Sequence, residues 1–306
     1  MKDPLHRNTA LSGSNSKGQA DLKACIPRET AFGHPMDFLT NRFVYVVVSP
    51  RARGLSVGIN MNPDKKCNFD CVYCEVNRRA VPRESRLDVR VMVSELEKTF
   101  ALIQSGRLRE LSWYSSLADE LLELRHVTLS GDGEPTLAPN FLEAVQEVFH
   151  VRALGRCPFF KMVLVTNATG LDLPKVQEGL SWFTAEDEIW AKLDGGTQAY
   201  LNWVDRPDVP LRKILQNILN LARRRPVVIQ SLFPAINGIE PPNTEIEQYV
   251  QRLNELKLAG AQISLVQIYS ATRPTFNSAC GHLPLKSLSA IAQAVRRGTG
   301  LKAEVL

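Results

Sequence analysis

Short apolar runs alternate with amphipathic segments over most of this chain. Six runs have the length and composition of strands buried in a sheet: Leu55–Asn60, His126–Gly131, Met162–Asn167, Glu188–Asp194, Val227–Phe233 and Gln262–Tyr269. Between them, apolar residues recur at helical spacing, for example at Ile246, Val250 and Leu253. We expect helix starts near Pro139-Asn140 and Pro241-Pro242, and helix ends at Gly260 and Gly298.

A regular succession of strands and helices is typical of a parallel α/β sheet. An open doubly wound sheet and a barrel both fit, but six units are too few for a complete eight-stranded barrel. We therefore predict a partial (β/α)6 barrel of the TIM type. Arg42–Ser49 is expected to precede it as an extra strand, and Leu301–Leu306 to add an edge strand. The predicted organisation is a flexible segment over residues 1–40 and one partial-barrel domain over residues 41–306.

Composition indicates a soluble protein with an ordinary core, since 44% of the 306 residues are hydrophobic and 23% are charged. No run approaches the roughly 18–20 apolar residues of a membrane span, and the N-terminus lacks the pattern of a secretion signal. Six cysteines without paired spacing outside one cluster do not form a disulfide framework. We expect a cytoplasmic protein that does not contact a membrane.

Positive charge gathers between residues 51 and 90, where nine basic residues face five acidic ones. Such a segment suits an anionic substrate such as RNA, but it also suits an ordinary solvated loop. The charge pattern leaves both interpretations open.

Three cysteines carry the clearest chemical signal: Cys67, Cys71 and Cys74, with C-x3-C-x2-C spacing. Three thiolates can hold three irons of a [4Fe–4S] cluster, whose usual complement is four cysteines. The fourth iron then stays open to a substrate or cofactor. The alternative is a zinc site with His34 or Cys25 as the fourth ligand, although zinc sites favour paired spacings.

Polar residues cluster where the predicted strands end. They include the segments Ser130–Thr136, Thr166-Asn167 and Lys192–Gly196, and Gln267. Because the carboxyl ends of parallel strands meet at one edge of a sheet or barrel, these groups are expected to face one mouth together with the cysteines.

The cysteine motif, with Tyr73 directly before its third cysteine, resembles that of the radical S-adenosylmethionine (SAM) superfamily. Gly133-Glu134-Pro135 after the next strand is similar to the family's Gly-Gly-Glu-Pro motif, with Asp132 in place of its first glycine. The stretches Ser49–Asn60, Lys66–Cys74 and Leu129–Thr136 are similar to the branch of iron–sulfur oxidoreductases related to tRNA wybutosine synthesis.

This resemblance implies a partial barrel in which the three cysteines bind a [4Fe–4S] cluster and SAM chelates the open iron. Reductive cleavage of SAM would then start hydrogen abstraction from a substrate. Further residues are implied to bind SAM or the substrate: Tyr73 along the adenine, Glu134 at the methionine ammonium with Gly133 and Pro135 beside it, Asn167 at the ribose or carboxylate, and Lys192 and Asp194 at SAM or the substrate.

Each of these residues also has a purely structural interpretation. Glu134 before Pro135 suits the start of a helix, Tyr73 suits packing, and Asn167 suits a turn. Lys192 and Asp194 project from the same face of a strand and suit an ion pair. Cys25, Cys157 and Cys280 are assigned no role.

The substrate stays open, because the wybutosine enzyme needs further upstream cysteines and this chain offers only Cys25 there. One alternative is a radical enzyme that modifies a base of RNA, such as tRNA. Others are an activator of a glycyl-radical protein and a non-enzymatic metal-bearing module that binds RNA. Any radical SAM activity implies a reductant partner of the flavodoxin or ferredoxin type.

Overall fold

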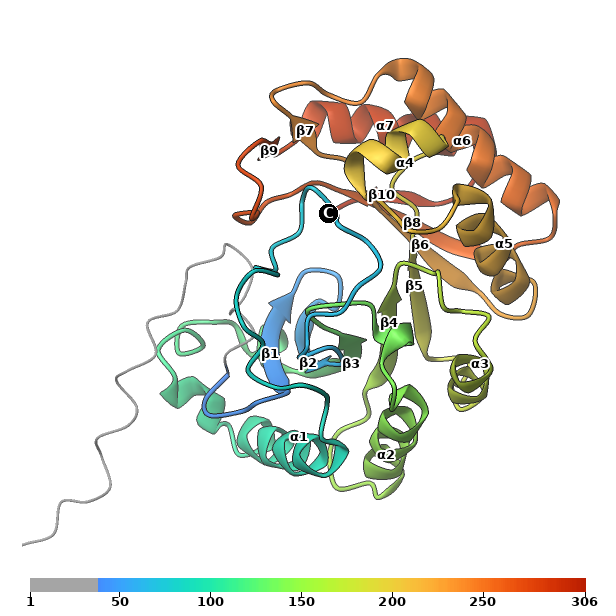
Figure 1. Ribbon diagram of the computed structural model, residues 1–306. Helices are drawn as coiled ribbons and strands as arrows, with labels where there is room; N and C mark the ends of the chain where they lie inside the picture. Colours follow the sequence, from blue (N-terminus) through green and yellow to red (C-terminus); the bar gives the residue numbers. More distant parts are fainter. Residues whose placement is uncertain (1–37) are drawn as a thin grey trace, which may run out of the picture.

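The computed structural model describes residues 38–306, and Figure 1 shows their course. The segment predicted to be flexible, residues 1–40, therefore lies almost wholly outside the described residues. Phe38, at the beginning of the described part, is buried in the core. The division into one flexible segment and one domain stays a prediction.

An eight-stranded sheet forms the centre of the molecule, in the order β1-β2-β3-β4-β5-β6-β8-β10. Its strands are β1 (Val44–Ser49), β2 (Gly54–Asn60), β3 (Leu124–Ser130), β4 (Lys161–Thr166), β5 (Glu188–Lys192), β6 (Val227–Leu232), β8 (Ile263–Tyr269) and β10 (Ala303–Val305). From β2 to β10 all neighbouring strands are parallel, and β1 pairs with β2 in antiparallel register.

All six predicted core strands are present, and the two predicted edge strands are β1 and β10. The predicted partial (β/α)6 barrel is confirmed, because the six parallel strands β2 to β8 follow one another in order without closing. A separate two-stranded ladder, β7 (Ala235–Ile236) with β9 (Cys280–Gly281), was not predicted. Strands of two residues leave no periodicity in a sequence.

Helices connect the strands and cover the outer face of the sheet (Figure 1). They are α1 (Val89–Gln104), α2 (Phe141–Ala153), α3 (Pro174–Leu180), α4 (Gln198–Val204), α5 (Leu211–Ala222), α6 (Asn243–Leu258) and α7 (Leu285–Thr299), with short 3-10 turns at Arg107–Glu110, Asp119–Leu122 and Pro135–Leu137. No helix among residues 38–306 has the length and apolar character needed to cross a membrane.

One predicted helix end is wrong. Helix α7 continues through Gly298 and ends at Thr299, and Gly300 takes the left-handed conformation (φ 69°) that closes it. A Cβ at position 298 would lie 2.4 Å from Cγ1 of Val250 in α6. Gly298 therefore allows two helices to approach closely, and Gly300 is the residue that ends the helix.

Residues alternate along each strand between two environments. One set, including Val57, Leu129 and Ile229, packs with the helices in the main core. The other set faces the inside of the curved sheet, where Val163, Trp190 and Val228 form a separate apolar cluster with Val165 and Leu265 at its edge. Toward the carboxyl ends of the strands, the inward positions become polar, and this change marks the mouth of the barrel.

Candidate functional site

The three cysteines lie on the long loop between β2 and α1, and all three side chains are half-buried with free thiols. Backbone hydrogen bonds attach this cysteine loop to the rest of the mouth at three places. Glu134 N donates to Lys66 O (3.1 Å), Val72 N donates to Val204 O at the end of α4 (2.8 Å), and Phe276 N donates to Cys74 O (3.0 Å). Segments distant in sequence thus fix the backbone around each cysteine.

Gly133 permits the first of these attachments. A Cβ at this position would lie 1.9 Å from the carbonyl oxygen of Lys66, so any larger residue would push the cysteine loop away. The predicted motif Gly133-Glu134-Pro135 therefore has a structural purpose, which is to bring the end of β3 against the residue preceding Cys67. Pro135 begins the short 3-10 turn that follows.

The Glu134 carboxylate is buried and surrounded by donors. It accepts hydrogen bonds from the Thr136 hydroxyl (2.6 Å), the Thr166 hydroxyl (2.5 Å), and the backbone N–H groups of Thr136 (3.1 Å) and Asn167 (2.7 Å). Burial raises the pKa of Glu134, and these donors oppose the shift. The carboxylate joins the ends of β3 and β4 directly beside the cysteine loop.

Asn167 continues this connection toward the cysteines. Its Nδ2 donates to Oδ1 of Asn68 (2.9 Å) and lies 4.0 Å from Sγ of Cys67. The backbone N–H of Phe69 also donates to that sulfur (3.4 Å). The predicted residues Glu134 and Asn167 are thus brought together with Cys67, although their contacts to SAM stay predictions.

The cysteine sulfurs also face a basic side chain. Nη2 of Arg78 lies 3.7 Å from Sγ of Cys74, and its guanidinium also contacts the thiol of Cys67. Burial raises the pKa of Cys67, and burial with nearby Asp205 raises that of Cys71. Metal binding by these thiols would therefore release protons.

The donor set fits a three-cysteine [4Fe–4S] cluster, because three thiols share one loop and two of them converge on one guanidinium. Within residues 38–306, no group of three or more His, Cys, Asp and Glu side chains converges on a single metal ion, the three cysteines included. A [4Fe–4S] cluster does not require such convergence, because each thiolate would bind a different iron. Both candidate fourth zinc ligands, His34 and Cys25, lie outside the described residues.

Tyr73 points between two buried carboxylates. Its hydroxyl donates to Asp194, at the end of β5, and lies 2.8 Å from Oδ1 of Asp205, at the end of α4. Burial and then the charge of Asp194 raise the pKa of Asp205, whereas the hydrogen bond from Tyr73 opposes that shift. This arrangement anchors Tyr73 by its hydroxyl, and its predicted contact with adenine stays a prediction.

Lys192 lies on the same face of β5 as Asp194, as predicted, and the two form an ion pair of 3.2 Å. Its ammonium donates to the hydroxyl of Tyr269 (3.1 Å) and lies 5.0 Å from the ring centre of Tyr73. Burial opposes the charge, but Asp194 and its neighbours outweigh it and raise the pKa of Lys192. Lys192 is therefore a fixed cation at the barrel mouth.

Sequence reasoning assigned no individual role to three residues of this site: Arg78, Asp205 and Tyr269. Tyr269 and Gln230 continue a pattern of polar inward positions at strand ends, which a register analysis of each strand could have found. Asp205 and Arg78 reach the site from a helix end and a loop, where no sequence pattern indicates the direction of a side chain.

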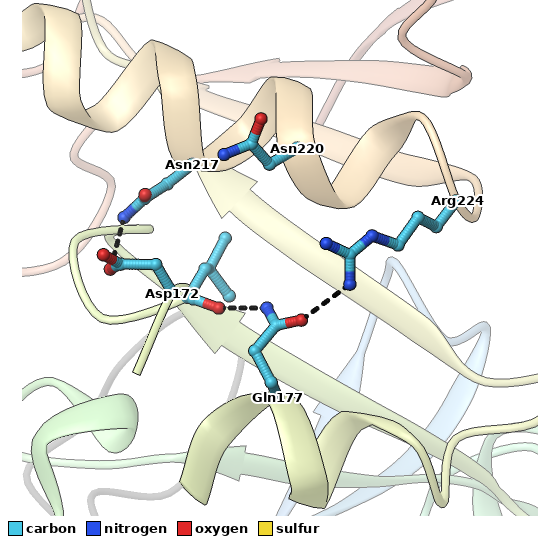
Figure 2. Close-up of a pocket in the computed structure, with 6 residues that line it drawn as sticks. Asp172, Gln177, Asn217, Asn220 and Arg224 are labelled. Carbon is cyan, nitrogen blue, oxygen red and sulfur yellow. Dashed lines mark hydrogen bonds between the residues drawn. The ribbon is translucent and has the colours of Figure 1, made fainter. Parts of the chain in front are cut away.

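A small cavity of about 160 Å³ lies elsewhere, between α3 and α5 (Figure 2). Its polar groups largely pair with one another, as in the contacts of Asn217 with Asp172 (3.2 Å) and of Arg224 with Gln177 (3.0 Å). It contains no cysteine, histidine or hydroxyl nucleophile among its lining residues. The barrel mouth is therefore the candidate site.

No family model matches the chain. It is 24% identical over 273 residues to a UPF0026 protein of Helicobacter pylori, which covers 83% of this chain and 80% of that protein. It is also 31% identical over 181 residues to a UPF0026 protein of Synechocystis, covering 57% of each.

Several solved structures share the fold. TYW1 with a bound lysine-pyruvate adduct has a TM-score of 0.52 at 17% identity and covers 81% of this chain and 74% of that one. SuiB of Streptococcus suis bound to S-adenosylmethionine has a TM-score of 0.56 at 14% identity, and this chain spans 52% of it. Spore photoproduct lyase has a TM-score of 0.51 at 8% identity and covers 81% of this chain and 76% of that one. At identities of 8–17% these structures show the fold alone, and the predicted resemblance is confirmed at that level.

Proposed function

We propose that this protein is a radical SAM enzyme whose Cys67, Cys71 and Cys74 bind a [4Fe–4S] cluster. The observation that carries the proposal is the placement of the three cysteines on a loop attached to the mouth of a partial (β/α)6 barrel. When bound and reduced, such a cluster supplies the electron that cleaves SAM and starts hydrogen abstraction.

The residues of the mouth would position SAM and exclude water from it. Gly133 holds the cysteine loop against β3, and Glu134 fixes the turn that carries Asn167. Lys192 supplies a buried positive charge close to the carboxylate of Asp194. We keep seven residues as the SAM or substrate contacts of this proposal: Tyr73, Gly133, Glu134, Pro135, Asn167, Lys192 and Asp194.

A reductant must deliver the electron, and a flavodoxin- or ferredoxin-type protein is the partner proposed for that step. Reduced thiols and a reduced cluster also favour a cytoplasmic location for the enzyme.

Anaerobic reconstitution with iron and sulfide tests the cluster directly. We expect about four irons per chain and an electron paramagnetic resonance spectrum of the reduced protein that changes when SAM is added. Cys74→Ala should bind less iron, and Cys280→Ala should not differ from the unmodified chain. One tightly bound zinc per chain with no iron–sulfur absorbance would overturn the proposal and favour the metal-bearing binding module.

A second candidate function is modification of an RNA base by the same chemistry. The observation that favours it is the exposed basic edge of the cysteine loop, which includes Lys66 and Arg79. The Arg79 guanidinium lies 5.6 Å from the ring centre of Phe276, which is 51% exposed, so a cation and an aromatic face adjoin at the surface.

Binding of a tRNA pool at several salt concentrations tests this candidate. Phosphate contacts predict an affinity that falls steeply between about 50 and 200 mM salt. Lys66→Gln and Arg79→Gln should each weaken binding, whereas Lys175→Gln on α3 should not. An affinity that is independent of salt would contradict RNA as the substrate.

A further inference from the structure

One guanidinium on the inner side of the barrel forms no ion pair with an acidic side chain of residues 38–306. Arg51 lies in the turn between β1 and β2, and its Cζ is 4.4 Å from the ring centre of Tyr269 at the end of β8. Its Nε is buried and has no hydrogen-bond partner among the described residues. Arg51 thus stacks on an aromatic face while one of its donors, the Nε–H, has no acceptor among residues 38–306.

The neighbouring cations are already paired. Lys192, which shares the Tyr269 side chain with Arg51, is matched by Asp194 at 3.2 Å. Arg273 acts electrostatically on Arg51 and forms an ion pair of 3.3 Å with Glu75. The positive charge of Arg51 is therefore the one that this group of side chains leaves uncompensated.

Arg51 is half-buried with a buried Nε, and a charge that is partly removed from water without a counter-charge is costly. A ligand that supplies the opposite charge offsets this cost. Burial, with a smaller effect of Arg273, lowers the pKa of Arg51, yet a guanidinium stays charged near neutral pH. Its planar donors match the two oxygens of a carboxylate or a phosphate.

We propose that Arg51, stacked on Tyr269, is the binding residue for an oxyanion of the substrate, either a phosphate or a carboxylate group. The inference rests on the proposed function only for the reaction that the bound molecule undergoes. The binding of an oxyanion at Arg51 does not depend on that reaction. The inference therefore predicts that the substrate carries an anionic group.

An oxyanion bound at Arg51 would lie apart from the cysteine loop. Contacts run from Tyr73 on the cysteine loop to Lys192 and then to Tyr269, and Arg51 lies against the ring of Tyr269. Two side chains thus stand between the oxyanion subsite and the loop where SAM is proposed to bind. A substrate held at Arg51 extends toward the cysteine loop along the inner face of the sheet.

Binding of inorganic phosphate and of acetate to the reconstituted protein, with and without SAM, tests this inference. Broadening of the ³¹P signal of phosphate and of the ¹³C signal of labelled acetate reports the binding of each probe. Arg51→Gln is compared with Arg53→Gln, an exposed arginine in the same turn. Arg51→Lys retains the charge but removes the planar fork. Circular dichroism verifies that each variant is folded.

We expect Arg51→Gln to bind the preferred probe about tenfold or more weakly, because a charge-assisted hydrogen bond is lost. The affinity of Arg51→Lys for the probe should lie between that of Arg51→Gln and that of the unmodified chain. Arg53→Gln should bind the probe nearly as well as the unmodified chain. The tighter probe identifies the group as phosphate or carboxylate. Equal losses in Arg51→Gln and Arg53→Gln would overturn the inference.

The inference would also be overturned if Arg51→Gln weakened SAM binding as strongly as probe binding, because the carboxylate of SAM would then occupy the subsite. Failure of the proposed function is distinguishable from failure of this subsite. A protein that binds the probe through Arg51 but never cleaves SAM rejects the enzyme and retains the subsite, whereas SAM cleavage without probe binding does the reverse.

Discussion

The two ends of strand β5 both carry a buried aspartate next to a basic residue, but their surroundings differ. Asp187 precedes the strand at the amino end of the barrel, and Asp194 follows it at the carboxyl end. Asp187 pairs with Arg152 and Asp194 pairs with Lys192, both through fully buried carboxylates.

At the amino end, every oxygen of the carboxylate is satisfied. Asp187 accepts two hydrogen bonds from Arg152 (2.7 and 3.2 Å), one from Met162 N (2.8 Å) and two from Thr184 (2.8 and 2.9 Å). Burial works against ionisation, but these donors outweigh it and lower the pKa of Asp187. This group joins β4, β5 and α2 and leaves nothing for a ligand.

At the carboxyl end of the barrel, the charged side chains of the described residues do not all have a counter-charge or a full set of hydrogen bonds. Asp194 and Asp205 both accept from the hydroxyl of Tyr73, and burial with the charge of Asp194 raises the pKa of Asp205. The buried Nε of Arg51 has no hydrogen-bond partner within residues 38–306. Such incomplete compensation is typical of binding sites, whereas the complete compensation at Asp187 is typical of structural groups. The comparison assigns stability to one end of the barrel and chemistry to the other, as in related barrels.

Removal of Asp187 gives the largest predicted effect on stability. Asp187→Ala leaves the guanidinium of Arg152 buried without its counter-charge, which should lower the free energy of unfolding by about 3–5 kcal/mol. Urea denaturation measures the loss, and the folded variant should still cleave SAM at a low temperature. A loss below about 1 kcal/mol would show that the amino end is not a structural anchor.

Removal of Lys192 should affect activity more than stability. Lys192→Met leaves Asp194 its bonds from Tyr73 and Leu232 N, so we expect a cost of about 1–3 kcal/mol. Formation of 5′-deoxyadenosine should fall about 100-fold, because the proposed contact of the Lys192 ammonium with SAM or the substrate is lost.

Lys161→Met is the matched control for this change. Lys161 pairs with Glu188 at the amino end through half-exposed side chains, so its loss should cost under about 1 kcal/mol and leave activity unchanged. Equal effects of the two lysine substitutions on activity would remove the distinction between the two ends.

Substitution of Arg78 should shift the electronic properties of the cluster. Loss of its contacts with Cys67 and Cys74 removes positive charge and N–H donors from the sulfurs. We expect Arg78→Gln to lower the reduction potential by about 50 mV, close to the 59 mV of a tenfold change for one electron. A redox titration followed by electron paramagnetic resonance measures this shift. Arg79→Gln is the control, and an equal shift in both variants would contradict a direct role.

Low pH should lower the stability of the folded protein through Asp187. Because the pKa of Asp187 is lower in the folded than in the unfolded chain, its contribution to stability is complete above the unfolded pKa of about 3.9. That contribution is lost as the pH falls through the folded pKa. Asp187→Asn should therefore unfold with a weaker dependence on pH below about 4 than the unmodified chain. Denaturation midpoints between about pH 5 and 2.5 test this, and parallel curves would contradict it.

The sequence predicted the frame of the fold because buried parallel strands are continuous apolar runs with flanking polar residues. All six core strands lie within two residues of their predicted starts. Helix α7 shows the limit: a glycine ends a helix only when its φ is positive, and the sequence cannot distinguish Gly298, which packs on Val250, from Gly300.

The candidate site was predicted only where it follows a strand or the cysteine motif. Lys192, Asp194, Glu134 and Asn167 lie at one mouth because strand ends converge, and their roles stay predictions. Arg51, which reaches the Tyr269 ring from a turn, owes its position to the curvature of the whole sheet. Contacts of this kind depend on tertiary packing and leave no local pattern.

The most direct measurement is chromatography of 5′-deoxyadenosine after dithionite and SAM are added to anaerobically reconstituted protein. The account predicts product from the unmodified chain, none from Cys71→Ala, and an unchanged amount from Cys157→Ala, whose half-buried thiol lies outside the cysteine loop. A chain that holds about four irons but forms no 5′-deoxyadenosine would contradict the account.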